Sequence, residues 1–195
     1  NPVIWKYQGN KTWKKEMPLS SIIHYPDANC KKEKELLCRW LHVNPENIAV
    51  GSGSDELIDL IAQSFLNAGD KILIPTPTFF RFANASVKVG ARVVTVPLSE
   101  KNGFEWDSKM SNLFLKKIQD PAVKLIWLAN PNNPTGVNVP DHILEKIIGQ
   151  GKLVVLDKVL NGFTKELREG AKQIWRRENI IILSTTKATS RIQKP

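Results

Sequence analysis

The sequence predicts an α/β protein in which a mostly parallel β-sheet lies between two layers of helices. Short apolar runs recur along the chain, and several of them show no polar alternation, as strands covered on both faces require. Segments with helical spacing of apolar residues separate these runs. Strands that alternate with helices are typical of three-layer α/β domains. The expected strands are residues 48–50, 71–74, 92–96, 124–129, 152–156 and 179–183.

Helices are expected between these strands and once before the first of them. The periodic segments are residues 31–42, 54–68, 78–89, 107–119, 140–149 and 166–177. Residues 1–23 have no clear period, so we predict an extended N-terminal arm there. The remainder, residues 24–195, is predicted to form one domain, since 195 residues with 42% apolar content suit one globular core, or one domain with a small appendage.

Charge and cysteine content restrict the class of protein. The formal net charge is +9, but the excess lies at the two ends of the chain and no basic run is interleaved with aromatic residues. This distribution favours a solvated basic surface over a nucleic-acid groove. Cys30 and Cys38 form neither a disulfide framework nor a metal pattern, which indicates a reducing compartment and packing roles for both thiols.

The sequence contains no targeting or membrane signal. No apolar run approaches eighteen residues, and there is no signal peptide, so we expect a cytoplasmic protein that binds neither membrane nor metal. The chain begins without methionine and stops at Pro195, soon after a strand. We therefore expect it to be a fragment of a longer protein.

A rigid polar turn follows the strand at 124–129. In open α/β sheets ligands bind beyond the carboxyl ends of strands, so these ends are where functional residues are expected. The turn reads NPNNPTG, and its prolines restrict Asn130 and Asn133 to extended conformations that aim their side-chain amides. The alternative is a simple stop between strand and loop.

A glycine- and serine-rich segment precedes the helix expected at 54–68. Gly51 and Gly53 permit a tight turn, and the amides at the start of the following helix could bind a phosphate. The segment is neither a G-x-G-x-x-G motif nor a P-loop. Ser54 is expected as the N-cap, and capping alone is the alternative to a ligand role.

Three further strand ends carry candidate residues. Phe79 or Phe80 could stack on a flat ring or belong to the core. Asp157 ends a buried strand and needs a partner, either a protonated ring nitrogen or a helix to cap. Lys187, three residues after Ser184, could form a Schiff base with a carbonyl if its pKa is depressed, or could simply be solvated.

Taken together, these motifs resemble the fold-type I pyridoxal-phosphate aminotransferases, and within them the histidinol-phosphate branch. The motifs that carry the resemblance are HYPDANC, NPENIAVGSGSDELIDL, PTPTFFRF, NPNNPTG, VVLD and S-x-x-K, between His24 and Lys187. The resemblance implies the large domain of such an enzyme, without its C-terminal small domain. It also implies pyridoxal 5′-phosphate as the cofactor and a homodimer.

The resemblance implies a role for each matching residue. Lys187 would hold the cofactor covalently and move a proton, and Asp157 would pair with its pyridinium nitrogen. Phe79 would stack on the ring, and Asn133 would bind the ring hydroxyl oxygen. The residues implied at the phosphate are Gly53, Ser54, Asp55, Ser184 and, from the other subunit, Tyr25.

The sequence departs from the family pattern at two positions. Leu160 stands where the family has a tyrosine that donates to the ring oxygen, and Pro195 stands where it has a phosphate-binding arginine. The function implied is amino transfer between a phosphorylated amino substrate, such as histidinol phosphate, and 2-oxoglutarate. The alternatives are a threonine-phosphate decarboxylase and a degenerate domain without turnover, and a basic nucleic-acid binder ranks below both.

Overall fold

A computed structural model describes residues 27–161 and 177–185 of the chain. The chain divides into two units, residues 1–50 and residues 51–195, which are treated separately. The predicted boundary between an arm and a domain, at residues 23 and 24, lies outside the described residues.

The first unit contains one helix, α2 (Lys31–Leu41), and a short 3-10 helix, η2 (Pro45–Asn47), in its described part. The helix expected at 31–42 is therefore confirmed. The carboxylate of Asp27 accepts hydrogen bonds of 3.0 Å from the backbone amides of Asn29 and Lys31. The bond from Lys31 satisfies one of the donors that the start of a helix leaves without intrahelical acceptors.

The strand predicted at 48–50 is wrong. These residues follow η2 in an irregular segment, and they pair with none of the strands in the described part of the chain. Val50 is 37% exposed. Three apolar residues satisfy a sequence pattern, but a strand also requires a neighbour to accept its ladder hydrogen bonds.

The second unit contains a parallel sheet. Its strands are β1 (Lys71–Thr76), β2 (Arg92–Pro97), β3 (Val123–Ala129), β4 (Leu153–Asp157) and β5 (Ile180–Leu183). They lie in the order β2-β1-β3-β4-β5, and every pairing is parallel. The other five predicted strands are therefore confirmed, as is the predicted fold class.

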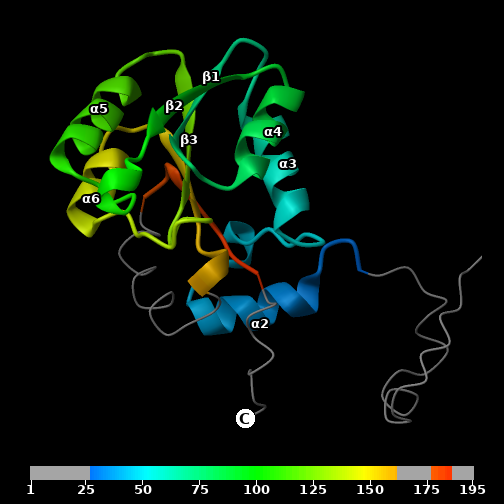
Figure 1. The fold of residues 1–195 in the computed structure, drawn as a ribbon. Coiled ribbons are helices and arrows are strands. Elements are labelled where there is room, and N and C mark those ends of the chain that lie inside the picture. Colours follow the sequence, from blue (N-terminus) through cyan, green and yellow to red (C-terminus); the bar gives the residue numbers. More distant parts are fainter. Residues whose placement is uncertain (1–26, 162–176, 186–195) are drawn as a thin grey trace, which may run out of the picture. The chain divides into compact units, whose positions relative to one another are not determined.

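Helices cover both faces of this sheet. One face carries α3 (Ser54–Phe65) and α4 (Phe80–Lys88), and the other carries α5 (Ser108–Ile118) and α6 (Asp141–Ile148), as Figure 1 shows. Two short 3-10 helices, η3 (Glu100–Asn102) and η4 (Val159–Asn161), complete the described elements of this unit. The helix predicted at 166–177 falls outside the described residues except for Arg177.

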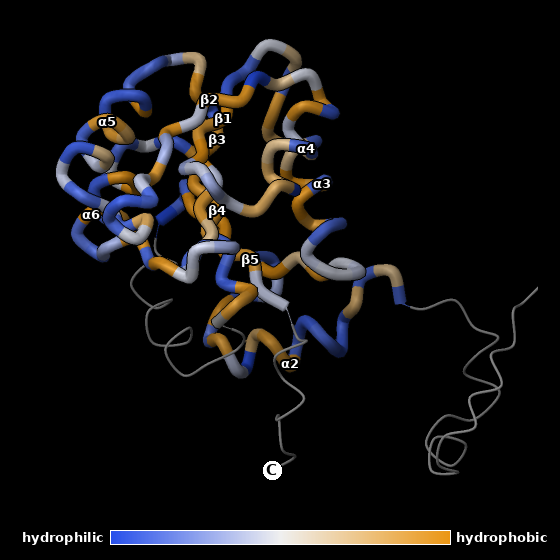
Figure 2. The backbone as a smooth tube through the Cα atoms, in the orientation of Figure 1, coloured by the Kyte–Doolittle hydropathy of each residue, from blue (hydrophilic) through white to orange (hydrophobic). Residues whose placement is uncertain are grey.

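The apolar strands are buried between these two helical layers. In β3, Leu125 and Trp127 pack in the core beneath α3 and α4, whereas Ile126 and Leu128 pack in the core beneath α5 and α6. All four side chains are fully buried. Because successive side chains of a strand point to opposite faces, burial on both faces requires the continuous apolar run seen in the sequence. Figure 2 shows the hydrophobic strands between helices in which hydrophobic and hydrophilic residues are mixed.

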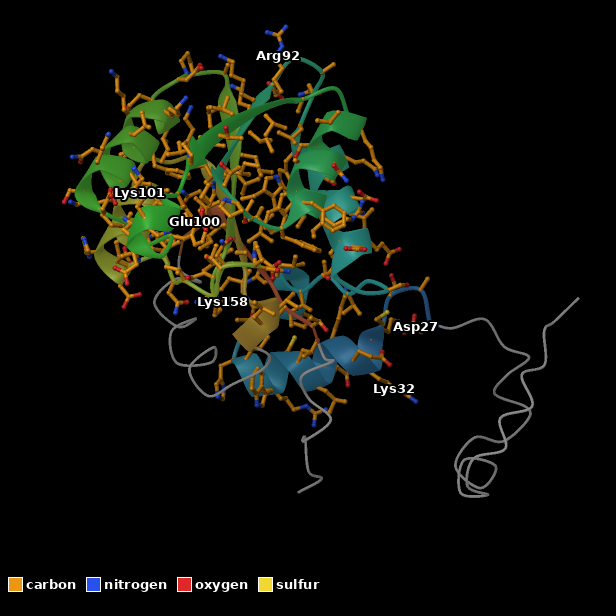
Figure 3. All side chains as sticks on the ribbon, in the orientation of Figure 1. Asp27, Lys32, Arg92, Glu100, Lys101 and Lys158 are labelled. Atoms are coloured by element: carbon orange, nitrogen blue, oxygen red, sulfur yellow. The ribbon has the colours of Figure 1, made fainter. Side chains whose placement is uncertain are left out.

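The strand order places a topological switch point between β1 and β3. The chain leaves β1 toward one edge of the sheet, through α4 to β2, and then passes through α5 to β3 on the other side of β1. In open α/β sheets, ligands usually bind at such a switch point, beyond the carboxyl ends of the strands. In Figure 3, Arg92 marks the amino end of β2 and Lys158 lies just beyond the carboxyl end of β4.

Within the described part of the chain, no helix combines the length and apolar character needed to cross a bilayer.

Candidate active site

A small hollow lies at the carboxyl ends of β3 and β4. Four residues that the sequence analysis selected contribute to its walls: Ser54, Phe79, Asn133 and Asp157. Its other walls are Ala129, Pro131, Val159 and Leu160. Segments that lie about a hundred residues apart in the sequence therefore meet at the edge of the sheet that the fold class predicts.

The first wall is the start of α3. Gly53 is the N-cap of this helix, with φ 111° and ψ 173°, a conformation that is essentially restricted to glycine. The prediction that Ser54 is the N-cap is therefore wrong. Ser54 is instead the first helical residue, because the positive φ needed to enter the helix falls on the glycine.

The start of α3 can bind an anion. The first amides of any α-helix have no intrahelical acceptor, so Ser54 and Asp55 expose amide donors at the positive end of the helix dipole. The amide of Ser52 donates to a carboxylate oxygen of Glu56, which fixes the turn that leads into the helix. The Asp55 side chain turns toward α4, where its Oδ1 lies 3.3 Å from Arg81 Nε.

The second wall is the turn after β3. The side-chain Oδ1 of Asn130 accepts from the backbone amide of Val139 at 2.9 Å, and the backbone amide of Asn130 donates to the carbonyl of Asp157 at 2.8 Å. The Asn130 side chain therefore holds the turn together and is not aimed at a ligand. Asn133 is exposed, lines the hollow, and makes no side-chain hydrogen bond to the described residues.

Asn132 is a structural residue of this turn that the sequence analysis did not select. It is buried, and its amide nitrogen donates to the carbonyl of Pro77 at 2.9 Å and to Thr135 Oγ1 at 2.8 Å. Its oxygen accepts from Thr78 Oγ1 at 2.8 Å. Asn132 thus joins the turn after β3 to the turn after β1 across the switch point, and leaves Asn133 to face the hollow.

The third wall is Phe79, whose ring is held by other aromatic rings. Phe79 meets Phe82 edge-on at 5.6 Å between centroids, and Phe82 stacks on Trp127 at 5.0 Å with an interplanar angle of 9°. Trp127 Nε1 donates to Ser86 Oγ at 3.2 Å. Phe80, the other candidate for ring stacking, is 64% exposed. The packing of Phe82 and Trp127 in the core therefore fixes the orientation of Phe79.

The fourth wall is Asp157, the last residue of β4. Its Oδ1 accepts a hydrogen bond of 2.8 Å from the backbone amide of Val159, the first residue of η4. This bond corresponds to helix capping, one of the two partners predicted for Asp157. Burial raises the pKa of Asp157 to about 6, although the hydrogen bond from Val159 opposes the shift. No cation of the described residues pairs with it, so a positively charged group placed in the hollow would find an unpaired carboxylate.

Ser184 lies just beyond β5, and its buried hydroxyl has no hydrogen-bond partner among the described residues. A buried hydroxyl without a partner costs free energy, so this group is available to a ligand. Lys187 and Tyr25 lie outside the described residues. The part of the hollow that the described residues form has a volume of about 60 Å³, room for only a few water molecules, so a larger ligand would lie partly outside these walls.

The described residues contain no group of three His, Cys, Asp or Glu side chains placed to hold a metal ion. The groups available at the hollow are amides, hydroxyls, one carboxylate and an aromatic face. This set suits a ligand with a phosphate, a flat ring and a protonated ring nitrogen.

The chain matches the family model for aminotransferase class I and II over residues 10–189. Among curated proteins, it is 38% identical over 167 residues to histidinol-phosphate aminotransferase of Thermoanaerobacter sp. (strain X514), covering 85% of this chain and 46% of that protein. It is 40% identical over 140 residues to the enzyme of the same name from Thermoanaerobacter pseudethanolicus, covering 71% of this chain and 38% of that protein. The chain thus spans less than half the length of these relatives.

Solved structures share the fold. The histidinol-phosphate aminotransferase of Sinorhizobium meliloti, in complex with pyridoxal-5′-phosphate, superposes with a TM-score of 0.73 at 24% identity, covering 88% of this chain and 48% of that one. The Clostridium acetobutylicum enzyme of the same name also has a TM-score of 0.73, at 21% identity, covering 90% of this chain and 51% of that one. At these identities the structural likeness supports the fold alone.

Proposed function

The chain belongs to the class I and II aminotransferase family, and from that premise we propose that it binds pyridoxal 5′-phosphate and serves amino-group transfer. The observation that carries the proposal is the meeting of Ser54, Phe79, Asn133 and Asp157 at one hollow.

The residues at the hollow suit the cofactor. When bound, pyridoxal phosphate supplies a sink for the electrons released at the substrate Cα. The Asp157 carboxylate would hold a proton on the ring nitrogen, and its burial strengthens that interaction because few waters compete for the charge. The Phe79 ring would lie against the cofactor ring, and the Asn133 amide would donate to the ring hydroxyl oxygen.

The phosphate would bind at the start of α3. The amides of Ser54 and Asp55 and the Ser54 hydroxyl would donate to it, and Gly53 provides the backbone conformation that exposes those amides. The Ser184 hydroxyl, which has no partner among the described residues, would add one donor. Tyr25 of a second copy would supply another, which makes a homodimer part of this proposal.

Lys187 would carry out the covalent attachment of the cofactor and the proton transfer. Its amine would hold the cofactor covalently. It would then take a proton from the substrate Cα and deliver that proton to the cofactor. Asp157 would keep the ring nitrogen protonated throughout. The relatives at 38–40% identity are named histidinol-phosphate aminotransferases, so we propose histidinol phosphate and 2-oxoglutarate as the substrates, in a cytoplasmic reaction.

An amino-transfer assay tests this function. The chain is loaded with pyridoxal phosphate, given histidinol phosphate, and then given 2-oxoglutarate. We expect glutamate to form only when both substrates are present, and Lys187→Ala to form none. Release of CO₂ from threonine phosphate would favour a decarboxylase instead, and cofactor binding without either product would identify a domain that does not turn over.

A further inference from the structure

The proposed phosphate site has an electrostatic difficulty. The first turn of α3 carries Asp55 and Glu56, and Asp59 follows one turn later. Acidic residues at this position stabilise an empty helix because they interact with the positive end of its dipole. They also repel a phosphate dianion that approaches the same amides. The carboxylate of Glu56 accepts a hydrogen bond from the amide of Ser52. The carboxylate of Asp55, 67% exposed, has a charged partner.

Arg81, in the first turn of α4, is that partner. Its Nε lies 3.3 Å from Asp55 Oδ1, and its Nη2 lies 3.1 Å from Asp59 Oδ2. The same Nη2 donates to the backbone carbonyl of Asp55 at 3.4 Å. The Arg81 side chain is 15% exposed. One guanidinium thus contacts the carboxylate and the backbone of a residue proposed to bind phosphate.

The contact of Arg81 with Asp59, whose side chain is 29% exposed, differs from a surface ion pair, whereas the Asp55 carboxylate is 67% exposed. Burial opposes ionisation of Asp59, but hydrogen bonding and charge from Arg81, with smaller contributions from Lys88, outweigh it and leave the pKa of Asp59 lowered. Lys88, the other cation near this carboxylate, is 61% exposed and reaches only Asp59, at 3.4 Å. A partly buried guanidinium with several contacts fixes its neighbours better than an exposed ammonium.

Arg81 also lies two residues after Phe79, the residue proposed to contact the ring. The start of α4 therefore supports both ends of the cofactor site, with Phe79 at the hollow and Arg81 against the first turn of α3. We propose that Arg81 is a positioning residue for the cofactor phosphate, which holds the first turn of α3 in place and neutralises Asp55 beside the amides that bind the phosphate. This inference rests on the proposed function.

The phosphate gives the test, because pyridoxal lacks that group but has the same ring. Affinities for pyridoxal phosphate and for pyridoxal are measured by fluorescence titration of the chain and its variants. We expect Arg81→Gln to bind pyridoxal phosphate about tenfold more weakly while its affinity for pyridoxal stays within about twofold, because only the phosphate senses the unpaired Asp55 charge. The matched control is Lys88→Gln, which should bind both ligands as the unmodified chain does.

A rescue separates charge neutralisation from simple helix packing. Adding Asp55→Asn to Arg81→Gln removes the charge that Arg81 neutralises, so affinity for pyridoxal phosphate should recover most of the loss. Equal losses for both ligands, or a double variant no better than Arg81→Gln, would show that Arg81 only packs α3 against α4. If Arg81→Gln does not fold, Arg81→Lys should show a smaller loss that is again confined to the phosphorylated ligand, and a loss shared by both ligands would overturn the inference.

The outcomes also distinguish failure of the Arg81 inference from failure of the proposed function on which it rests. An unmodified chain that binds neither ligand would overturn the proposed function and this inference together. An unmodified chain that binds pyridoxal phosphate, with Arg81→Gln equally tight, would overturn the role of Arg81 alone.

Discussion

Asp157 is a buried carboxylate without a cationic partner in the described part of the chain, and this arrangement has a cost in the absence of ligand. Its pKa rises from 3.8 to about 6 because burial disfavours the charged form. A raised carboxyl pKa stabilises the protein at low pH, and that contribution disappears as the pH rises from about 4 through about 6. The cofactor-free chain is therefore destabilised at neutral pH by the group proposed to pair with the cofactor.

Asp157→Asn should stabilise the cofactor-free chain relative to the unmodified chain as the pH rises. The amide can still accept from Val159 but cannot ionise. The difference in unfolding free energy between variant and unmodified chain should grow by about 2 kcal/mol from pH 4 to pH 8, measured by urea unfolding. The same variant should lose affinity for pyridoxal phosphate at pH 8.

The control for this prediction is Asp120→Asn. A hydrogen bond from Lys71, at 2.7 Å, lowers the pKa of Asp120, so its charge stabilises the fold. This variant should be less stable than the unmodified chain at pH 8, and the difference should shrink on acidification. A pH-independent difference for Asp157→Asn would contradict the assignment of an ionising buried carboxylate.

Leu160 lines the hollow and is 60% exposed, so a larger side chain can be placed there without repacking a core. Leu160→Tyr should bind pyridoxal phosphate about two- to tenfold more tightly, because a hydroxyl donor to the ring oxygen contributes about 0.5–1.5 kcal/mol. Leu160→Phe supplies the same ring without the hydroxyl. Equal affinities for the two variants, measured by titration, would exclude that hydrogen bond.

The positions of site residues could be predicted from the sequence where the residue stands at or just beyond the end of a strand. Asp157 ends β4, Phe79 and Asn133 follow β1 and β3, and all three lie at the hollow. The partnership of Arg81 with Asp55 joins residues 26 positions apart on two helices, which no local pattern reveals. The sequence contains one indication that Arg81 has a partner, because Arg81 is a single charged residue inside the apolar run FFRFA and a buried charge needs a partner.

At the scale of elements, strands were predictable where both faces are buried. The runs that form β1, β3 and β4 are continuous because helices cover both sides of the sheet. The error at 48–50 arose because three apolar residues do not specify a pairing partner. The error at Ser54 arose because serine and glycine both suit a helix N-cap, and only the backbone conformation decides between them.

Gly53 tests the importance of that backbone conformation. Alanine at this position would meet no atom within 4 Å, so its cost is backbone strain alone, about 1–3 kcal/mol. We expect Gly53→Ala to lower stability and also to weaken the binding of pyridoxal phosphate, because strain is relieved by moving the amides of α3. Thermal unfolding and a ligand titration measure the two effects.

The matched variant is Gly103→Ala, in the turn after η3. Gly103 has a φ of 69° and also leaves space for a Cβ atom. This variant should lose stability, by about 1–2 kcal/mol, without losing affinity for pyridoxal phosphate. Unchanged affinity in Gly53→Ala would show that the start of α3 does not bind the phosphate.

At the scale of the whole molecule, cofactor binding and turnover are separate questions. The chain spans less than half the length of its curated relatives, whereas the hollow brings together the first residue of α3, an aromatic ring and a carboxylate. The proposed cofactor binding can therefore be tested with this chain, and the amino-transfer assay examines turnover independently. The Lys187 amine is the one proposed participant that joins the cofactor covalently.

The most direct measurement of the central claim is the site of that covalent bond. The chain is incubated with pyridoxal phosphate, reduced with borohydride and mapped by peptide mass spectrometry. Lys158 is the internal competitor, because burial lowers its pKa, although the charge of Asp141 opposes the shift, and a larger fraction of its amine is therefore neutral than in an ordinary lysine. We predict one modified residue, Lys187, and loss of the label when Asp157→Asn weakens binding. A label on Lys158, or one spread over surface lysines and insensitive to Asp157→Asn, would contradict a cofactor site at the carboxyl edge of this sheet.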